Sequence, residues 1–367
     1  MATDLKRGVE DVGAPTFPLI ELHCHLEGAI TLDDVVEART STGSGALAVD
    51  AAEVLRKAIT LPPGAWPLAT WRPYFDRRRQ CFESLDMIEE LTRQVVLRYQ
   101  RIGCRHLELR FNPVYMGALT SLDTTEVVRR VIAGAAPPDR RMSTAVIVLA
   151  TRDRGPAEAV AAASLAVGFA GSGVAGFDLA GQEIGNPAAD FREAFDIARN
   201  GGLGLTAHAG EEVGPESIAA ALDVLGVERV GHGVSATAAP EVVSSILRDG
   251  VTLEMCPLSN IRTGCVGSIA AHPAAQLLRE GVRVTLNSDD PGFLGHTLLD
   301  DFREMATTAE LTDDELTTLV ANAAEGAFLP ADGIADLLTR VRADFRVAAQ
   351  AGFSPTQLLH QVTAGQP

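Results

Sequence analysis

The sequence predicts a (β/α)8 TIM-type barrel, a closed ring of parallel strands surrounded by helices, with an additional helical lid over its mouth. Eight short apolar runs, most of them rich in β-branched residues, recur along the chain. Segments of helical period, rich in Ala, Leu and Glu, lie between many of these runs. Buried strands that alternate with amphipathic helices favour a parallel sheet covered by helices. Polar residues end several runs, and the carboxyl ends of strands are where barrel active sites form.

The expected elements are as follows in chain order. The strands span residues 18–25, 104–111, 144–150, 174–181, 203–208, 229–233, 251–256 and 283–289. The clearest helices span residues 85–100, 187–199, 215–225, 240–248 and 272–280. Further Ala-rich helices, about 311–360, are expected to pack outside the barrel. We expect residues 1–367 to form a single barrel domain.

Residues 40–70 depart from this pattern. They contain Gly-Ser-Gly, Pro-Pro-Gly and only weak helix signals. We expect this segment to form an excursion over the barrel mouth, so that the lid spans about residues 40–80.

Composition and charge limit the classes of partner. The chain has 367 residues, of which 46% are hydrophobic, and a net charge of −17. An acidic surface repels nucleic-acid phosphates and anionic lipids, so we expect a small, neutral or weakly charged ligand, no nucleic acid and no membrane. Five sparse cysteines without a Cys-x-x-Cys pair indicate buried, reduced thiols in a cytoplasmic protein. The polar amino terminus is unlike a signal peptide, and no apolar run approaches the ~18 residues of a membrane span. A homo-oligomer is possible, but the sequence does not specify one.

Four residues at strand ends form a candidate metal site. His23 and His25 end the first strand, and the alternation of a strand points both side chains to one side. His208 ends the fifth strand and Asp289 ends the eighth. Because the first and last strands are neighbours in a closed barrel, these groups can converge on one ion. Three imidazoles and a carboxylate suit Zn²⁺, with one position left for water, whose pKa a bound dication lowers to about 7.

Three further polar residues lie beside this set. Glu211 follows His208 by three residues and can exchange a proton with a substrate atom. His232 ends the sixth strand between two glycines, where it can orient hydroxide or stabilise developing charge. Asp290 adjoins Asp289 and can take the proton of water or accept a hydrogen bond from the substrate.

Each motif also has a structural interpretation when taken alone. His-x-His can be two core groups, Asp289-Asp290-Pro291 can be a turn or helix cap, and Glu211-Glu212 can be a solvated pair. Their joint occurrence at the ends of separate strands favours the active site. The other histidines are expected to be hydrogen-bonded core groups: His106, His272, His296 and His360. The sequence has no His-Glu-x-x-His helix. It also has no Pro-Cys-x-x-Cys motif, which excludes the zinc-dependent cytidine-deaminase type.

With these motifs the chain resembles the adenosine deaminase family of the amidohydrolase superfamily, from residue 19 to about 301. The shared motifs are Glu-Leu-His-Cys-His-Leu-Glu-Gly at 21–28, Asp-Leu-Ala-Gly at 178–181, His-Ala-Gly-Glu at 208–211, Gly-His-Gly at 231–233, Cys-Pro-Leu-Ser-Asn at 256–260 and Asn-Ser-Asp-Asp-Pro at 287–291. The resemblance implies one zinc ion held by the four residues at the strand ends. It also implies hydrolytic deamination at C6 of an adenine ring.

The resemblance further implies a role for each nearby group. Glu211 is expected to deliver a proton to ring N1, which makes C6 electrophilic. His232 and Asp290 are expected to position the attacking hydroxide, and Asp290 also to meet ring N7. The backbone of Gly181 is expected to contact ring N3. Ammonia then leaves and a 6-oxopurine remains.

The family has a helical lid, and one segment here has the corresponding pattern. Trp71, Tyr74 and Phe75 are spaced as one face of a helix, so they are expected either to contact substrate or to form ordinary helix core. The same segment contains four arginines that we expect on a solvated face, with contact to an acidic substrate group as the alternative: Arg72, Arg77, Arg78 and Arg79. The strand-end residues Arg110, Asn112 and Glu254 are expected to support the site from behind.

Glu27 leaves the identity of the substrate undecided. Typical adenosine deaminases have Asp there, associated with the ribose 5′-hydroxyl, whereas Glu resembles the family's adenine and 6-aminodeoxyfutalosine deaminases. The Cys-Pro-Leu-Ser-Asn and Asn-Ser-Asp-Asp-Pro motifs lean toward adenine deaminases, but Gly231 before His232 resembles the nucleoside branch. We therefore expect adenosine or 2′-deoxyadenosine as substrate. A 5′-modified adenine nucleoside such as 6-aminodeoxyfutalosine is the first alternative, and free adenine is the second.

Two other classes fit less well. A two-metal phosphoesterase or related amidohydrolase would need a bridging lysine, but the only lysines, Lys6 and Lys57, are not at strand ends. A barrel that only binds a ligand is disfavoured because every catalytic position is filled.

Overall fold

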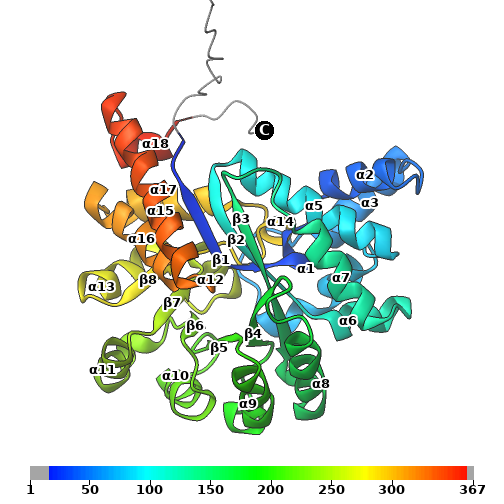
Figure 1. Ribbon diagram of the computed structural model, residues 1–367, viewed down its shortest axis with the longest axis horizontal. Helices are drawn as coiled ribbons and strands as arrows, with labels where there is room; N and C mark the ends of the chain where they lie inside the picture. The colour runs from blue at the N-terminus through cyan, green and yellow to red at the C-terminus, as the bar shows by residue number, and fades with distance from the viewer. Residues whose placement is uncertain (1–15, 362–367) are drawn as a thin grey trace, which may run out of the picture.

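The computed structural model describes residues 16–361 and contains a ring of eight parallel strands in chain order (Figure 1). The strands are β1 Leu19–His25, β2 Cys104–Phe111, β3 Ser143–Thr151, β4 Val174–Ala180, β5 Gly204–Ala209, β6 Arg229–His232, β7 Thr252–Met255 and β8 Arg283–Leu286. Each strand pairs in parallel with the next one. The predicted (β/α)8 barrel is confirmed, and the expected strands differ from the observed ones by up to three residues at their ends.

Helices surround the strands, as Figure 1 shows. They are α1 Leu26–Ala29, α2 Leu32–Ser41, α3 Val49–Ile59, α4 Arg72–Arg79, α5 Leu85–Arg101, α6 Pro113–Thr120, α7 Thr124–Gly134, α8 Pro156–Val167, α9 Arg192–Asn200, α10 Pro215–Ala220, α11 Pro240–Asp249, α12 Pro257–Thr263, α13 Ala274–Arg279, α14 Pro291–Leu294, α15 Leu298–Thr308, α16 Asp313–Gly326, α17 Ala331–Gln350 and α18 Pro355–Leu359. Short 3-10 or π turns are η1 Leu68–Thr70, η2 Arg152–Arg154, η3 Ala188–Phe191, η4 Ala221–Leu225, η5 Ala236–Ala238 and η6 Ile269–Ala271. The main apolar core lies between the strands and these helices.

The ring closes between β1 and the residues that follow β8. The backbone N–H of His25 donates to the carbonyl of Asp289 at 2.8 Å. The N–H of Asp289 donates to the carbonyl of His23 at 2.9 Å. The closure therefore joins three of the four residues of the candidate metal site.

Charged residues fill the barrel interior, where layers of branched apolar side chains are more common. They are Glu108, Arg110, Asp178, Arg229 and Glu254, each at most 1% exposed. Arg229 pairs with Glu108 at 2.7 Å and with Glu254 at 2.5 Å. Arg110 pairs with Glu254 at 2.8 Å and with Asp178 at 2.9 Å. Because each charge has an opposite partner, this interior chain of ion pairs can be buried.

The C-terminal helices lie outside the strands as expected, but the link between α16 and α17 closes one end of the barrel. Phe328 donates its backbone N–H to Glu108 at 2.6 Å, and its ring lies 3.6 Å from the guanidinium of Arg229. Gly176 and Gly204 make room for this ring, since a Cβ on either would lie within 2.6 Å of it. This link therefore covers the end of the barrel opposite the strand carboxyl ends.

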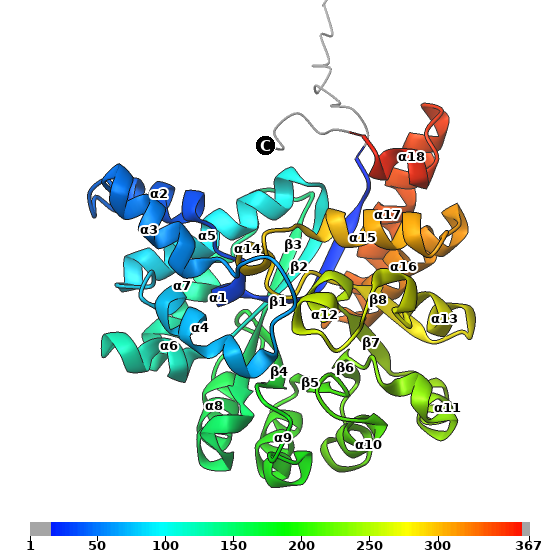
Figure 2. The same ribbon diagram turned by 180° about the vertical axis from the view of Figure 1, so that it is seen from behind.

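The segment expected to form the lid contains α3, η1 and α4, and Figure 2 shows α4 to the left of β1 and β4, between α1 and α6. Helix α3 was not predicted because its cap, Ala48, offers no side-chain hydrogen bond and only Ile59 of the helix is buried. Arg78 attaches α4 to the rest of the molecule by donating to the carbonyls of Glu27, Gly28, Ile30 and Ile59.

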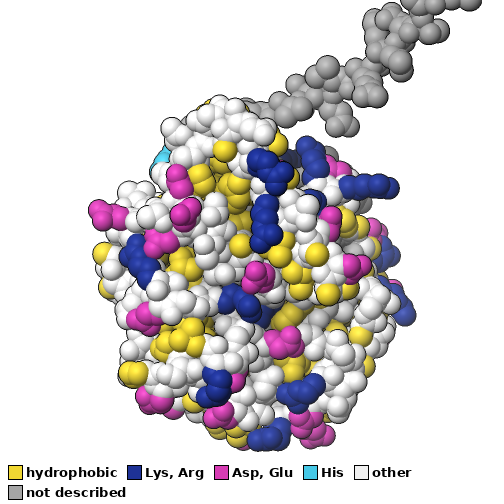
Figure 3. Space-filling view, turned by 60° about the vertical axis from the view of Figure 1, so that its left-hand side comes forward, with side chains coloured by type: hydrophobic (Ala, Val, Ile, Leu, Met, Phe, Trp, Pro, Cys, Tyr) yellow, Lys and Arg dark blue, Asp and Glu magenta, His cyan; other side chains and the backbone are white. Residues whose placement is uncertain are grey.

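The surface shown in Figure 3 has acidic and basic side chains interspersed. Within residues 16–361 no helix has the length and apolar character needed to cross a bilayer. The expectation of buried cysteines holds for Cys24, Cys81, Cys104 and Cys256, but Cys265 is exposed in the turn after α12. The expected core position of His360 is also wrong, because this residue is exposed at the end of α18.

Candidate active site

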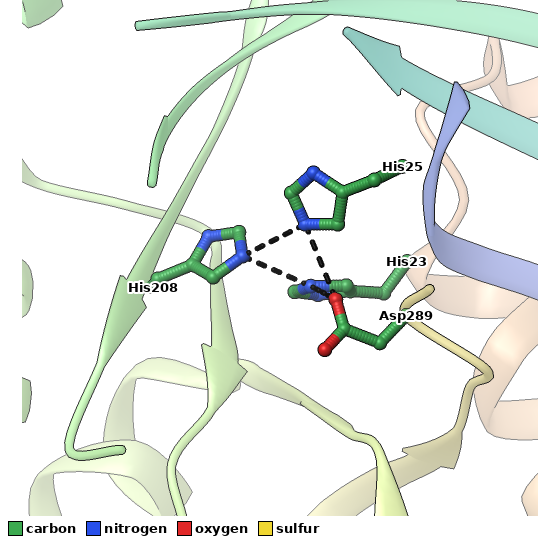
Figure 4. A group of neighbouring side chains, drawn as sticks. All are labelled: His23, His25, His208 and Asp289. Atoms are coloured by element: carbon green, nitrogen blue, oxygen red, sulfur yellow. Dashed lines mark hydrogen bonds and ion pairs between the residues drawn. The ribbon is translucent and has the colours of Figure 1, made fainter. Parts of the chain in front are cut away.

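Four side chains from three strand ends meet at the barrel mouth (Figure 4). The Nε2 atoms of His23 and His25 each lie 3.1 Å from Nε2 of His208. Asp289 Oδ1 lies 3.3 Å from Nε2 of His23 and 3.2 Å from Nε2 of His25. The structure thus brings together all four residues that the sequence predicts as metal ligands.

Backbone geometry places Asp289 in this group. Its φ of 61° lies in the left-handed region, which residues other than glycine rarely adopt. The two hydrogen bonds to the end of β1 hold it in this conformation. Backbone strain of this kind is typical of functional positions.

Two buried carboxylates fix the tautomers of two histidines. His23 Nδ1 lies 2.7 Å from Glu254 Oε2, and His208 Nδ1 lies 3.3 Å from Asp178 Oδ1. Burial alone would raise the pKa of each carboxyl group, but neighbouring positive groups, Arg110 among them, hold both pKa values below the usual range. Ionised carboxylates accept hydrogen bonds, so each histidine donates from Nδ1 and keeps a lone pair on Nε2. The expected supporting role of Glu254 and Arg110 agrees with these contacts.

These contacts fit a metal ion. Burial lowers the pKa of His208 to about 4, so that its ring is neutral at pH 7. His23 and His208 then point lone pairs at each other across 3.1 Å, beside the Asp289 carboxylate. Lone pairs that face each other repel unless a cation lies between them. Three imidazoles and one carboxylate match the donors that a single dication prefers.

Ser259 supports Asp289 from the other side. Its hydroxyl donates to Asp289 Oδ2 at 2.6 Å, while Oδ1 faces the imidazoles. Ser259 lies on α12, which begins directly after β7. The sequence analysis included it only as part of a motif, because nothing in the spacing links it to Asp289.

Glu211 lies on the loop after β5, and Glu183 holds this loop in place. The Glu183 carboxylate accepts the backbone N–H groups of Gly210, Glu211 and Glu212 at 2.9, 2.8 and 3.0 Å, and the hydroxyl of Ser217. Burial raises the pKa of Glu211 well above its usual range, and nearby carboxylates raise it further. Glu211 is thus a buried acid that holds its proton more tightly than an exposed glutamic acid does. The sequence analysis did not identify Glu183.

His232 has a left-handed φ of 63° and lies 3.4 Å from Glu211, measured from Nε2 to Oε2. Its ring centre is 4.9 Å from that of His23. The preceding residue, Gly231, leaves room for His23, because a Cβ there would lie 2.8 Å from its ring. Gly231 therefore permits close packing of two imidazoles.

Asp290 lies beside the same group and is 4% exposed. Its Oδ1 is buried without a hydrogen-bond partner among residues 16–361. Burial, together with Asp289, raises the pKa of Asp290 well above its usual range. Gly28 permits this position, since a Cβ there would lie 1.6 Å from Oδ1. An unpaired buried oxygen at the mouth is suited to contact a substrate or water.

A cavity of about 310 Å³ adjoins these groups. Its wall includes Glu27, Trp71, Phe75 and Gly181, together with all the predicted metal and catalytic residues except His23. Tyr74 is not part of the wall and instead packs on Phe293 at 5.7 Å between ring centres. Trp71 and Phe75 also pack on Phe293, so they belong to a small core and also line the cavity. Their contact with substrate stays a prediction.

The four arginines of the lid divide into two pairs. Arg72 and Arg77 are exposed, and Arg72 lines the cavity. The expected solvated face is wrong for Arg78 and Arg79, which are 0% and 4% exposed. Arg79 donates to the carbonyl of Tyr115 at 2.9 Å. Both buried arginines bind backbone carbonyls, which explains their burial.

Four candidate metal ligands at the mouth of a (β/α)8 barrel, with a buried acid beside them, are the arrangement of a metal-dependent hydrolase of the amidohydrolase type. The family model described as "Adenosine deaminase" matches residues 18–344. The chain belongs to the adenosine deaminase family and is a metal-dependent hydrolytic deaminase.

Relatives with related names span nearly the whole chain. Adenosine deaminase of Serratia proteamaculans is 33% identical, covering 89% of this chain and 98% of its own length. Adenosine deaminase of Klebsiella pneumoniae is 32% identical, with the same coverage. Among solved structures, adenine deaminase of Arthrobacter aurescens has a TM-score of 0.79 at 29% identity, covering 89% of this chain and 98% of its own. An N6-mAMP deaminase of Arabidopsis shares the fold, with a TM-score of 0.77 at 23% identity and coverage of 90% and 98%.

Proposed function

We propose that this protein is a zinc-dependent deaminase that converts adenosine or 2′-deoxyadenosine, plus water, into inosine or 2′-deoxyinosine and ammonia. The observation that favours this proposal most is the buried Glu211, whose pKa burial raises, on the same cavity wall as three of the four candidate ligands. A neutral carboxylic acid there is suited to protonate a weakly basic ring nitrogen. The names of relatives at 32–33% identity support adenosine as the substrate.

His23, His25, His208 and Asp289 would hold the zinc ion. When bound, zinc lowers the pKa of water toward ~7, which makes hydroxide available at neutral pH. Glu211 donates its proton to ring N1 of the substrate and makes C6 electrophilic. His232 and Asp290 orient the attacking oxygen, and Asp290 takes up its proton. The backbone of Gly181 binds ring N3. The C6–N bond breaks as Asp290 passes this proton to the amino group, which leaves as ammonia, and the other proton of the water restores Glu211.

Free adenine is a second candidate because of Glu27. This residue is 6% exposed, and its Oε1 accepts the backbone N–H of Asn112 at 3.1 Å while the side chain lines the cavity. The additional methylene relative to Asp reduces the room at the end of the cavity expected to hold the ribose. The similarity to an adenine deaminase at 29% identity agrees with this alternative.

A phosphorylated substrate fits the cavity less well. The wall includes several carboxylates, namely Glu27, Asp153, Glu211, Asp289 and Asp290, against a single arginine, Arg72. A wall with a single arginine offers little charge compensation to a phosphate group. A 5′-modified nucleoside with a carboxylate, such as 6-aminodeoxyfutalosine, would depend on Arg72 alone.

A deamination screen tests these alternatives. Ammonia release by the zinc-loaded enzyme is measured with adenosine, 2′-deoxyadenosine, adenine, AMP, a 5′-thioadenosine and 6-aminodeoxyfutalosine. The proposal expects the highest kcat/KM for adenosine or 2′-deoxyadenosine. A preference for adenine of 100-fold or more would reject it, a discrimination that about 3 kcal/mol of differential binding provides. In that case Glu27→Asp should increase activity on adenosine relative to adenine.

A further inference from the structure

We propose that His272 and Asn260 are positioning residues that determine which ring nitrogen of His232 holds its proton. They form a buried chain of hydrogen bonds that ends on His232, outside the candidate metal quartet. This chain would keep His232 as a hydrogen-bond donor toward the cavity and prevent it from becoming a fifth metal ligand. The inference rests on the proposed function only in placing the reacting atoms near His232.

The chain begins at the backbone of α13. Ala274 N–H points at Nδ1 of His272 at 3.3 Å, so this nitrogen must offer a lone pair. Burial lowers the pKa of His272 to about 4, so the ring is neutral at pH 7. A neutral imidazole has one proton, and here it must be on Nε2.

The second step fixes the amide of Asn260, which is fully buried. His272 Nε2 lies 3.1 Å from Asn260 Oδ1 and donates its proton to this oxygen. The amide nitrogen then faces the other way and lies 3.0 Å from Nδ1 of His232. Because an amide NH₂ can only donate, Nδ1 of His232 must be the acceptor.

The consequence for His232 is a proton on Nε2, the nitrogen that faces Glu211 and the cavity. His23 and His208 have the opposite arrangement, because carboxylates behind them accept from Nδ1 and leave lone pairs on Nε2. The group that contacts Nδ1 of each ring is an amide or a carboxylate. This group thus decides whether Nε2 of the same ring acts as a hydrogen-bond donor or as a metal ligand. This distinction matters because the ring of His232 lies only 4.9 Å from that of His23 and 5.1 Å from that of His208.

Asn260→Asp is the sharpest variant, since it preserves shape and replaces the donor by an acceptor. A carboxylate at this position draws the proton of His232 to Nδ1. His272→Gln retains a donor near the position of Nε2 and is the conservative control. His272→Phe removes the donor, so the amide of Asn260 is free to rotate and His232 should show both tautomers.

The readout is the imidazole ¹⁵N chemical shifts of the full-length, zinc-loaded protein labelled with ¹⁵N-histidine, with His232 assigned by its loss in His232→Asn. The expected result is protonated Nε2 in the wild type and in His272→Gln, and protonated Nδ1 in Asn260→Asp. Turnover of the preferred adenine compound should fall about 100-fold in Asn260→Asp with KM nearly unchanged, as for loss of one oriented donor. His272→Gln should remain within about threefold of the wild type, well inside that 100-fold effect.

Protonated Nδ1 of His232 in the wild type would overturn the inference. An unchanged tautomer in folded, zinc-loaded Asn260→Asp would overturn it as well. If His272→Phe does not fold, Asn260→Asp still decides the matter. If the wild type deaminates no adenine compound, the proposed function fails, whereas the tautomer assignment is still tested by the spectra.

Discussion

At the scale of single residues, each imidazole in the site depends on the group behind it. Glu254 and Asp178 leave lone pairs on His23 and His208, whereas Asn260 leaves a proton on His232. Neighbouring histidines therefore serve two chemical purposes, as candidate metal ligands and as a hydrogen-bond donor. The pKa of Glu211 likewise depends on its surroundings, because burial and neighbouring negative charge both raise it.

Glu211→Gln should retain zinc but lose about 10²- to 10⁴-fold in kcat, because Gln cannot supply the proton for ring N1. Ammonia release measures kcat, and elemental analysis measures zinc. Glu216→Gln, at an exposed position beyond the same loop, is the control and should be unaffected. Turnover of Glu211→Gln near that of the wild type would reject the proposed acid.

His272 should make the free energy of unfolding depend on pH. Its folded pKa is about 4, below the usual 6.5, so the unfolded chain binds a proton first as the pH falls. The stability from this group is present above pH 6.5 and is lost as the pH falls to 4, a change of roughly 3 kcal/mol. Urea unfolding of metal-free wild type and His272→Gln at several pH values measures the difference.

The matched control for this prediction is His360→Gln, because His360 is exposed. Its pH dependence should follow the wild type. Equal slopes for wild type and His272→Gln between pH 6.5 and 4 would contradict the assignment of a neutral, buried ring.

At the scale of elements, short anchors place the loops that surround the cavity. Glu183 fixes the loop after β5 through three backbone N–H groups, and Arg78 fixes α4 against α1 and the end of α3. Each anchor is a single charged side chain that satisfies several backbone groups at once. Removing one leaves those groups buried and unpaired.

Arg78→Met should lower the free energy of unfolding by roughly 3 kcal/mol, since the carbonyls that Arg78 binds lose their donors. Arg77→Ala changes an exposed arginine on the same helix and should have an effect within about 0.5 kcal/mol. Urea unfolding compares the two variants. Similar stability of both would show that Arg78 is not needed to hold α4.

The sequence predicts those elements and site residues that depend on local sequence patterns. Apolar runs locate all eight strands, and polar residues at their ends locate the metal quartet with Glu211, His232 and Asp290. Contacts between distant segments have no such signal. Four arginines within eight residues suggest a solvated face, because the carbonyls that accept from Arg78 belong to distant residues, namely 27, 28, 30 and 59. The link from His272 to Asn260 is equally invisible in the spacing.

At the scale of the whole molecule, the candidate metal site connects β1, β5 and Asp289, which lies three residues beyond the end of β8. A bound ion should therefore stabilise the entire barrel. At a free zinc concentration 1,000-fold above the dissociation constant, binding adds about 4 kcal/mol, which corresponds to a rise in Tm of roughly 5–10 °C.

Chelation should accordingly lower the Tm of the wild type by that amount, as measured by calorimetry with and without a chelator. His208→Ala should contain no zinc, and its Tm should not respond to the chelator. A wild-type Tm that is unchanged by complete removal of zinc would contradict the structural role of the ion.

The interior chain of ion pairs has an evolutionary consequence. Arg110 binds both Asp178 and Glu254, and Glu254 also binds Arg229. Replacing Arg110 alone leaves Asp178 without an arginine partner and Glu254 with Arg229 only. Because these two acids orient His208 and His23, one substitution disturbs stability and metal affinity together. Evolution can replace these ion pairs only through several compensating substitutions. The effects of such substitutions on stability should be strongly non-additive. The barrel interior is therefore expected to be inherited as one unit, even where the lid and the surface diverge.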